Sequence, residues 1–230
     1  RFCEMDAGDV NNDGYADLYF SDYDSGEVGP SENPNNDLNN RLLINMGAAN
    51  PGVFVDESNA RMSGSMLQSA FGAGAGIVDL NMDGLKEVLK VSTLGGGPDH
   101  VAVMRNNPAA PGTFDNYTMF DTISPYHVTY GDLNNDNKPD VVVSEDQTDR
   151  YYLNNTTTAG AVPTLGPAIL FSTVGISGGT EAGFSGHGFI ADLDNDGWKD
   201  VFIADVDIDT NSCTRRSRIY HNFGNAPNVT

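Results

Sequence analysis

The sequence has few basic residues and few cysteines. It holds 12 lysines and arginines against 32 aspartates and glutamates, which gives a formal net charge of −20. Nucleic-acid binding needs a basic face that neutralises phosphates, so this charge balance argues against a nucleic acid as partner. The cysteines are Cys3 and Cys213. They leave two alternatives open, a single disulfide as in secreted proteins or two unrelated buried thiols.

Long apolar runs, helical periodicity and catalytic signatures are also missing. No apolar stretch approaches the roughly 20 residues of a membrane-spanning helix, so we expect no membrane span. No signal peptide is visible, and the chain opens at Arg1 inside a strand-like run, so we expect a processed or partial protein. The Gly-x-Ser-x-Gly, phosphate-loop and His-Glu-x-x-His motifs are absent, and no catalytic residue is predicted.

The chain does contain one nine-residue pattern four times. The four copies start at Asp9, Asp79, Asp132 and Asp192 and carry oxygen-bearing side chains at positions 1, 3, 5 and 9. Position 6 is Gly or Asn, the residues that best tolerate the positive φ of a tight turn. Calcium takes about six to eight oxygen ligands, often from alternate residues of such a loop, with a backbone carbonyl at position 7. The sequence therefore predicts about four Ca²⁺ sites. The expected ligands are Asp9, Asn11, Asp13, Tyr15, Asp17, Asp79, Asn81, Asp83, Leu85, Glu87, Asp132, Asn134, Asp136, Lys138, Asp140, Asp192, Asp194, Asp196, Trp198 and Asp200.

The repetition of the pattern distinguishes it from an ordinary surface turn. A lone stretch of Asp, Asn and Gly carries little weight, but these four match in register, each with an apolar residue at position 2. An EF-hand loop ends in a Glu at position 12 between two helices. These loops instead lead directly into apolar runs such as Val141–Val143, which are typical of buried strands. Each loop is therefore predicted to form the tip of a β-hairpin.

The repeat extends beyond the loop. A second shared segment follows each copy, at Arg41–Asn45, Ala102–Asn106, Arg150–Asn154 and Arg218–Asn222. In the first two repeats a turn and a further strand come next, at Gly52–Phe54 and Gly112–Phe114. Repeats with four strands are the signature of propeller blades. We predict an all-β fold, a β-propeller with about four blades in a single domain or segment, residues 1–230. The blade bounds are approximately 1–60, 61–122, 123–175 and 176–230.

These motifs resemble the FG-GAP/VCBS repeats of integrin α subunits and of many secreted bacterial proteins. The calcium pattern, the short strand after it and the Phe71-Gly72 pair before Gly74 carry the resemblance, which covers essentially the whole chain. Glu87 in place of Asp and Asn137 in place of Gly depart from the family pattern. The resemblance implies calcium-bearing blades and a ring that usually has seven of them, so this chain could be part of a larger ring.

Calcium also bears on the compartment. Extracellular calcium modules work at dissociation constants of roughly 10⁻⁴ to 10⁻³ M, which favours an extracellular or cell-surface location. The sequons at Asn116, Asn154, Asn155 and Asn228 are compatible with a glycoprotein, although Asn154 is also the asparagine that recurs in every repeat.

Three further features are candidates for contacts. The longest polar insertion, residues 21–40, and a shorter one at 205–216 are either partner-binding loops or solvated ones. His127 and His187 both stand five residues before a loop. On the innermost strand of a propeller blade they could meet near the axis, although repeat-position packing is the favoured interpretation.

Two classes of function remain. The first is a calcium-stabilised module for binding, adhesion or assembly with protein or glycan partners or with neighbouring subunits. In the fourth repeat no outer-strand segment is recognisable after Asn222, and an unpaired edge can add a strand from another chain. The second class is a carbohydrate-active enzyme such as a polysaccharide lyase. Because a lyase needs a base beside a cluster of Arg or Lys and the few basic residues are scattered, we favour the binding or assembly module.

Overall fold

The computed structural model describes residues 2–22, 39–68, 72, 74–92, 100–123, 125–145, 148–171, 184–206 and 217–224. Most of both insertions, Phe71, Cys213 and Asn228, together with the side chain of Cys3, lie outside the described residues. The chain forms two compact units. One consists of Arg1–Ser124 with Thr157–Pro163, and the other of Pro125–Thr156 with Thr164–Thr230.

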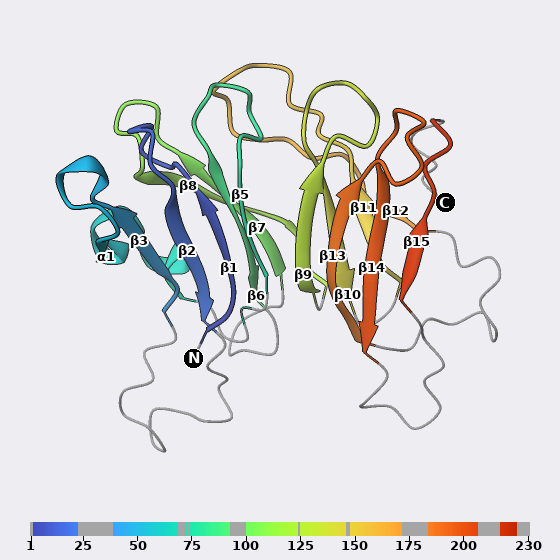
Figure 1. The fold of residues 1–230 in the computed structure, drawn as a ribbon, viewed down its shortest axis with the longest axis horizontal. Helices are drawn as coiled ribbons and strands as arrows, with labels where there is room; N and C mark the ends of the chain where they lie inside the picture. The colour runs from blue at the N-terminus through green and yellow to red at the C-terminus, as the bar shows by residue number, and fades with distance from the viewer. Residues whose placement is uncertain are drawn as a thin grey trace. The chain divides into compact units, whose positions relative to one another are not determined.

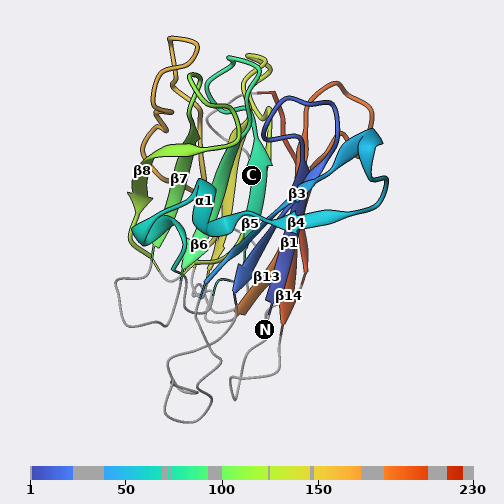
Figure 2. The ribbon, with the colours of Figure 1, turned by 90° about the vertical axis from the view of Figure 1, so that its left-hand side faces the viewer.

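The first unit contains two four-stranded antiparallel sheets, each with its strands in chain order (Figure 1). Blade one consists of β1 (Phe2–Gly8), β2 (Asp17–Asp22), β3 (Arg41–Asn45) and β4 (Phe54–Asp56). Blade two consists of β5 (Ala75–Val78), β6 (Glu87–Ser92), β7 (His100–Asn106) and β8 (Phe114–Asp121). The connection between them holds the one-turn helix α1 (Ser58–Arg61), visible in Figure 2, and a 3₁₀ turn at Gly64–Met66. Another 3₁₀ turn follows β3 at Gly47–Ala49.

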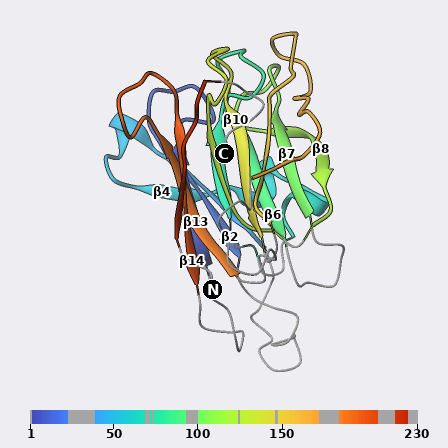
Figure 3. The ribbon, with the colours of Figure 1, turned by 90° about the vertical axis from the view of Figure 1, so that its right-hand side faces the viewer.

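The second unit repeats this plan. Blade three consists of β9 (Pro125–Gly131), β10 (Asp140–Glu145), β11 (Arg150–Tyr152) and β12 (Ile169–Leu170). Blade four has three strands within the described residues, β13 (Phe184–Ala191), β14 (Asp200–Val206) and β15 (Arg218–Tyr220). Its hairpin of β13 and β14 is seen edge-on in Figure 3. The predicted all-β propeller fold of four-stranded blades is confirmed, and each predicted loop is the tip of a hairpin between the first two strands of its blade.

Apolar side chains fill the space between the two blades of each unit. In the first unit Tyr19 and Leu42 of blade one pack with Val88 and Met104 of blade two, and all four are fully buried. In the second unit Val142 and Tyr151 of blade three pack in the same way with Val201, Ile203 and Tyr220 of blade four. Because successive residues of a strand face opposite sides of the sheet, each inner strand contributes side chains to the packing on both faces of its blade.

A glycine before the loop brings the innermost strands together. A Cβ on Gly8 would lie 2.6 Å from Cγ2 of Ile77, and a Cβ on Gly131 would lie 2.9 Å from Cγ2 of Ile190. Both contacts join a strand to the equivalent strand of the next blade, β1 to β5 and β9 to β13. The absence of a side chain therefore permits the close approach that a propeller axis requires.

The recurring asparagine joins one blade to the next. The Asn106 Nδ2 donates to the carbonyl of Lys86 in its own blade, at 2.9 Å, and to the carbonyl of Val10 in blade one, at 2.7 Å. In the second unit Asn222 donates in the same way to Lys199 and to Leu133. Asn106 and Asn222 are fully buried, and the bonds that they donate to the neighbouring blade are made away from water.

The hydrogen bond from the recurring asparagine to the preceding blade predicts that the same substitution lowers the free energy of unfolding by different amounts in two blades. Asn106→Ala removes the donor from the buried carbonyl of Val10 and from the partly buried carbonyl of Lys86, and a buried carbonyl left unsatisfied costs about 1–3 kcal/mol. Asn45, the equivalent residue of blade one, donates to the carbonyl of its own Ala16 and is only partly buried. We therefore expect Asn106→Ala to lower the free energy of unfolding by about 2 kcal/mol more than Asn45→Ala in urea denaturation. Equal losses would show that the inter-blade bond contributes nothing.

Candidate metal centres

The four loops share one backbone conformation. Position 6 has a left-handed φ in each, from 65° at Asn137 to 92° at Gly197. Position 4 is left-handed as well, which the sequence pattern did not reveal. Asn12, Asn135 and Asn195 suit this region. Met82 adopts φ 58° there and carries the strain that a longer side chain has in a left-handed conformation.

Backbone N–H groups hold the side-chain oxygens at positions 1, 3 and 5. In the first loop the Asp13 N–H donates to Oδ1 of Asp9 and to Oδ1 of Asn11, each at 3.1 Å. Gly14 N–H donates to the other Asp9 oxygen, and Tyr15 N–H donates to Oδ1 of Asp13. The same four bonds recur in the other three loops. Each of these oxygens keeps a further lone pair, so the loop preorders an oxygen-rich group of ligands.

The carboxylate at position 9 closes each loop from below. Asp17, Glu87, Asp140 and Asp200 are at most 2 % exposed. One oxygen of Asp17 accepts the N–H of Val10 at position 2, and the other accepts the N–H of Asn45 on the third strand. Asp140 and Asp200 repeat both bonds. This carboxylate thereby ties the loop to two strands of its blade.

Burial shifts the acidity of three of these carboxyls. It raises the pKa of Glu87 to about 8 and the pKa of Asp140 to about 6, against the hydrogen bonds that each accepts from backbone N–H groups. Burial also raises the pKa of Asp17. Repulsion from the other carboxylates of the loop adds to all three shifts. A cation in the loop would oppose both causes by stabilising the ionised form.

The surroundings of one carboxylate oxygen in the second loop indicate whether these residues fit a cation. Oδ2 of Asp83 is buried and accepts no hydrogen bond within the described residues. An ionised oxygen buried without a partner is costly, and a hard cation bound by oxygen ligands would satisfy it. In the fourth loop the carboxylates of Asp192, Asp194 and Asp196 lie within 4.8 Å of one another. The donor sets at these two loops therefore fit a divalent cation that prefers oxygen.

Comparison with known proteins supports this interpretation of the repeat. The family model for the FG-GAP-like repeat matches residues 79–143 and 132–203, together more than half of the chain. The chain belongs to the FG-GAP-like repeat family. A search of curated proteins found no match.

A solved structure has a similar fold. It is that of a lectin from Agrocybe aegerita, described as specifically recognising non-reducing terminal N-acetylglucosamine. It aligns with a TM-score of 0.53 and 16 % sequence identity over 87 % of this chain. The chain spans 46 % of the length of that lectin chain. At this identity the likeness shows the fold.

The FG-GAP loops differ from one another in neighbouring charges that the nine-residue pattern did not identify. In the third loop Nζ of Lys138 pairs with Oδ2 of Asp136 at 2.9 Å. In the fourth loop Nδ1 of His221 lies 3.1 Å from Oδ1 of Asp200 and 3.5 Å from Oδ2 of Asp194. Burial alone would raise the pKa of Asp200, but hydrogen bonds from Asn222, Leu193 and His221 outweigh it, and the pKa is lowered. In the sequence His221 immediately precedes the recurring asparagine Asn222. This position is the only sequence signal that could have identified His221 as a neighbour of the fourth loop.

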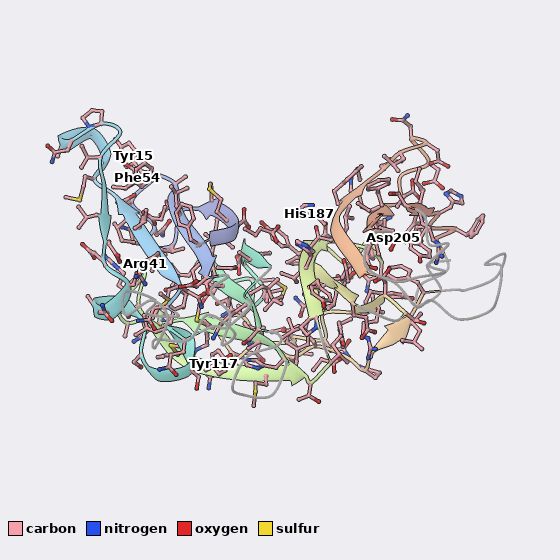
Figure 4. The ribbon with its side chains drawn as sticks, turned by 90° about the horizontal axis from the view of Figure 1, so that it is seen from below. Tyr15, Arg41, Phe54, Tyr117, His187 and Asp205 are labelled. Atoms are coloured by element: carbon pink, nitrogen blue, oxygen red, sulfur yellow. The ribbon has the colours of Figure 1, made fainter. Side chains whose placement is uncertain are left out.

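The residues at position 7 contribute to packing as well. The side chain of Tyr15 covers Gly47, where a Cβ would lie 2.8 Å from the ring, and Trp198 covers Gly224 at 2.5 Å. Tyr15 and Phe54, both of blade one, are labelled in Figure 4. The ligand role predicted for the backbone carbonyls of Tyr15, Leu85, Lys138 and Trp198 remains a prediction.

The histidine pair and one sequon are also placed by the structure. The rings of His127 on β9 and His187 on β13 lie edge to face with centroids 5.9 Å apart, so the two equivalent positions meet within their unit. His187 is labelled in Figure 4. Asn154 is 1 % exposed, and its Nδ2 donates to the Pro139 carbonyl at 3.0 Å. Asn154 is therefore a packing residue of the repeat.

Glu87 makes the stability of the metal-free protein depend on pH. The folded protein keeps the Glu87 proton up to a pKa of about 8, whereas the unfolded carboxyl loses it near 4.5. Unfolding between these values releases a proton, so the free energy of unfolding falls as pH rises, by at most about 1.4 kcal/mol per pH unit. We expect Glu87→Gln to flatten this fall between pH 6 and 8 when urea denaturation is followed in a chelator.

Comparison of the wild-type protein with Glu87→Gln separates the contribution of Glu87 to the pH dependence of stability from those of Asp140 and Lys90. The pKa of Asp140 is about 6, so it contributes mainly below the chosen range. Burial lowers the pKa of Lys90 to about 7, which makes stability rise with pH above that value. Both residues are present in both proteins and cancel in the difference. Parallel pH profiles for the two proteins would contradict the assignment to Glu87.

Proposed function

We propose that this chain is a calcium-stabilised FG-GAP propeller module that acts outside the cell in binding, adhesion or assembly. The observation that carries the proposal is the identical arrangement of oxygen ligands in four loops. It is supported by the buried Oδ2 of Asp83, which has no hydrogen-bond partner among the described residues. Calcium prefers such oxygen ligands. The side chains at positions 1, 3, 5 and 9 of each loop would hold it, with the backbone carbonyl at position 7.

The composition supports an extracellular location for such a module. Three carboxylates lie in each of the first three loops and four in the last, so these 36 residues hold thirteen of the 32 acidic residues. Open loops of this kind fill with calcium only where the ion is abundant. Among the described residues no helix is long and apolar enough to cross a bilayer.

The outer face of blade four is the best-supported contact surface. Phe189, Phe202 and Ile219 lie opposite one another across β13, β14 and β15. Phe189 is 45 % exposed and Ile219 is 62 % exposed. Leu193, at position 2 of the fourth loop, is 42 % exposed, whereas position 2 is fully buried in the other three loops. An apolar row of this kind on one sheet face is typical of an interaction site.

The repeat indicates what would cover this face. The equivalent residues of blade one, Tyr19 and Leu42, and of blade three, Val142 and Tyr151, are covered by the following blade of the same unit. There the recurring asparagine of the covering blade also donates to the carbonyl at position 2. We therefore propose that blade four receives a further blade of the same type from a neighbouring subunit, by the same apolar and hydrogen-bonding contacts.

A polysaccharide lyase finds less support in the structure. Four arginines are held in ion pairs with carboxylates close by, which are Arg41 with Asp56, Arg61 with Glu57, Arg105 with Asp115, and Arg150 with Glu145. A lyase would need such cations beside a base to neutralise the sugar carboxylate. The lectin likeness makes a glycan the alternative partner to a protein blade.

Calcium removal tests the stabilising role. A ligand at ten times its dissociation constant adds about 1.4 kcal/mol per site, so four sites add roughly 5–6 kcal/mol. We expect a chelator to lower the melting temperature of the protein by more than about 10 °C. Asp115→Asn, which removes the surface ion pair with Arg105, should leave this difference unchanged. A melting temperature that ignores the chelator would refute the proposal.

Sedimentation tests the contact surface. In calcium, the weight-average mass should rise with concentration, and Ile219→Lys should hold the protein as a monomer because it places a charge in the apolar row. Met119→Lys is the matched control, since Met119 is 50 % exposed on β8 of blade two and belongs to no such row. A wild-type protein that stays monomeric at every concentration, or an equal effect of Met119→Lys, would argue against this surface.

A further inference from the structure

The second FG-GAP loop has a cover that comes from a distant part of the chain. Residues Thr157–Pro163, which follow β11 in the sequence, belong to the compact unit of blades one and two. The N–H of Gly160 donates to the carbonyl of Asn81 at 3.3 Å. In return Nδ2 of Asn81 donates to the carbonyl of Ala161 at 3.2 Å. We call residues Thr157–Pro163 the cover segment.

The cover segment buries the second loop more deeply than the other three. Asn81 is fully buried, whereas the residue at position 3 is half-buried in the first and third loops and exposed in the fourth. Asp83 is half-buried, and its equivalents Asp13, Asp136 and Asp196 are exposed. Gly160 lies directly over Asp83, since a Cβ on Gly160 would be 3.4 Å from its Oδ2. This is the carboxylate oxygen that has no hydrogen-bond partner within the described residues.

Asn81 connects the cover segment to the ligand group. Its Oδ1 accepts the N–H of Asp83 at 3.1 Å, and its Nδ2 donates both to Oε1 of Glu87 and to the Ala161 carbonyl. One amide group therefore bonds two expected calcium ligands and the cover segment. A shift of the Asp83 backbone or of the Glu87 carboxylate would therefore act on Ala161 through this side chain.

Charge gives the direction of the coupling. Without a cation the carboxylates of Asp79 and Asp83 repel one another beneath the cover, and Oδ2 of Asp83 is desolvated with no hydrogen-bond partner among the described residues. A bound cation removes both penalties, while opening of the cover segment would relieve them in its absence. Because Gly160 lies over Oδ2 of Asp83, a closed cover would also slow the passage of an ion between the loop and water.

We propose that the cation of the second loop and the cover segment Thr157–Pro163 stabilise each other, so that ion binding fixes the segment and the segment makes this ion the slowest of the chain to exchange. The inference rests on the proposed calcium binding and goes beyond it, because it assigns one site a role in holding a segment that lies between β11 and β12. The other three loops share the ligand pattern. The first and third also have neighbours, Gly112 beside Asn11 and Gly197 bonded to Asn135, but the position-5 carboxylate stays exposed in all three.

Hydrogen–deuterium exchange with peptide resolution tests whether ion binding fixes the cover segment. With calcium we expect the cover segment to exchange about tenfold more slowly than in a chelator, because an opening reaction limits its exchange. Asp83→Asn should exchange there as fast in calcium as the wild type does in chelator. Asp136→Asn, the same change in the third loop, should leave the cover segment protected.

The outcomes separate this inference from the proposed function. If calcium protects the peptides of the four loops but leaves the cover segment unchanged, the coupling is wrong and calcium binding stands. If no loop peptide responds to calcium, calcium binding itself is wrong. Protection of the cover segment that Asp136→Asn removes as fully as Asp83→Asn would also overturn the coupling, because the effect would then be global.

The rate of ion release tests whether the cover segment slows the exchange of the ion in the second loop. After rapid mixing of the calcium-loaded protein with a fluorescent chelator, we expect one slow phase of about one ion per chain. Gly160→Val should accelerate it at least tenfold, because Gly160 has φ +75° and lies over Asp83. Gly52→Val is the matched control, since Gly52 has φ +77° with nothing within 4 Å of a Cβ. Absence of a slow phase, or equal acceleration by both variants, would contradict the role of the cover segment.

Discussion

The buried carboxylate at position 9 of each loop is the interaction on which the rest of the blade depends. It accepts the N–H of position 2 at the start of the loop and the N–H of the recurring asparagine on the third strand, as Asp17 does from Val10 and Asn45. Each of these carboxyls is at most 2 % exposed, so its ionised form is costly to bury without a compensating cation. The loops supply the remaining oxygens for that cation.

The same residues carry the constraint from one blade to the next. In blades two and four, the asparagine that donates its N–H to the position-9 carboxylate uses its side chain to bind the preceding blade, as Asn222 does at Leu133. The proposed cation would therefore stabilise the hairpin tip and the third strand of a blade together, and in blades two and four also the contact with the preceding blade. This chain of contacts explains how a small ion site can support a repeat fold whose blades cannot bury their faces alone.

The sequence predicted the parts of the structure that recur. The nine-residue period located the hairpin tips, and the apolar runs located the inner strands, because their pattern follows from local geometry and burial. The sequence did not reveal the left-handed backbone conformation of Met82 or the close approach of Ile77 to Gly8. His221 beside Asp200 and the cover segment over Asn81 were missed as well. These contacts occur once or join residues far apart in the chain, so no local pattern marks them.

The account is tested most directly by a crystal structure grown in calcium, with anomalous diffraction data. It predicts one calcium peak inside each of the four loops, bounded by the side chains of positions 1, 3 and 5 and by the position-9 carboxylate. In the second loop the peak should lie within coordination distance, about 2.3–2.6 Å, of Oδ2 of Asp83. Loops without calcium peaks, with the position-9 carboxylates buried as they are here, would contradict the claim that a cation stabilises the blades.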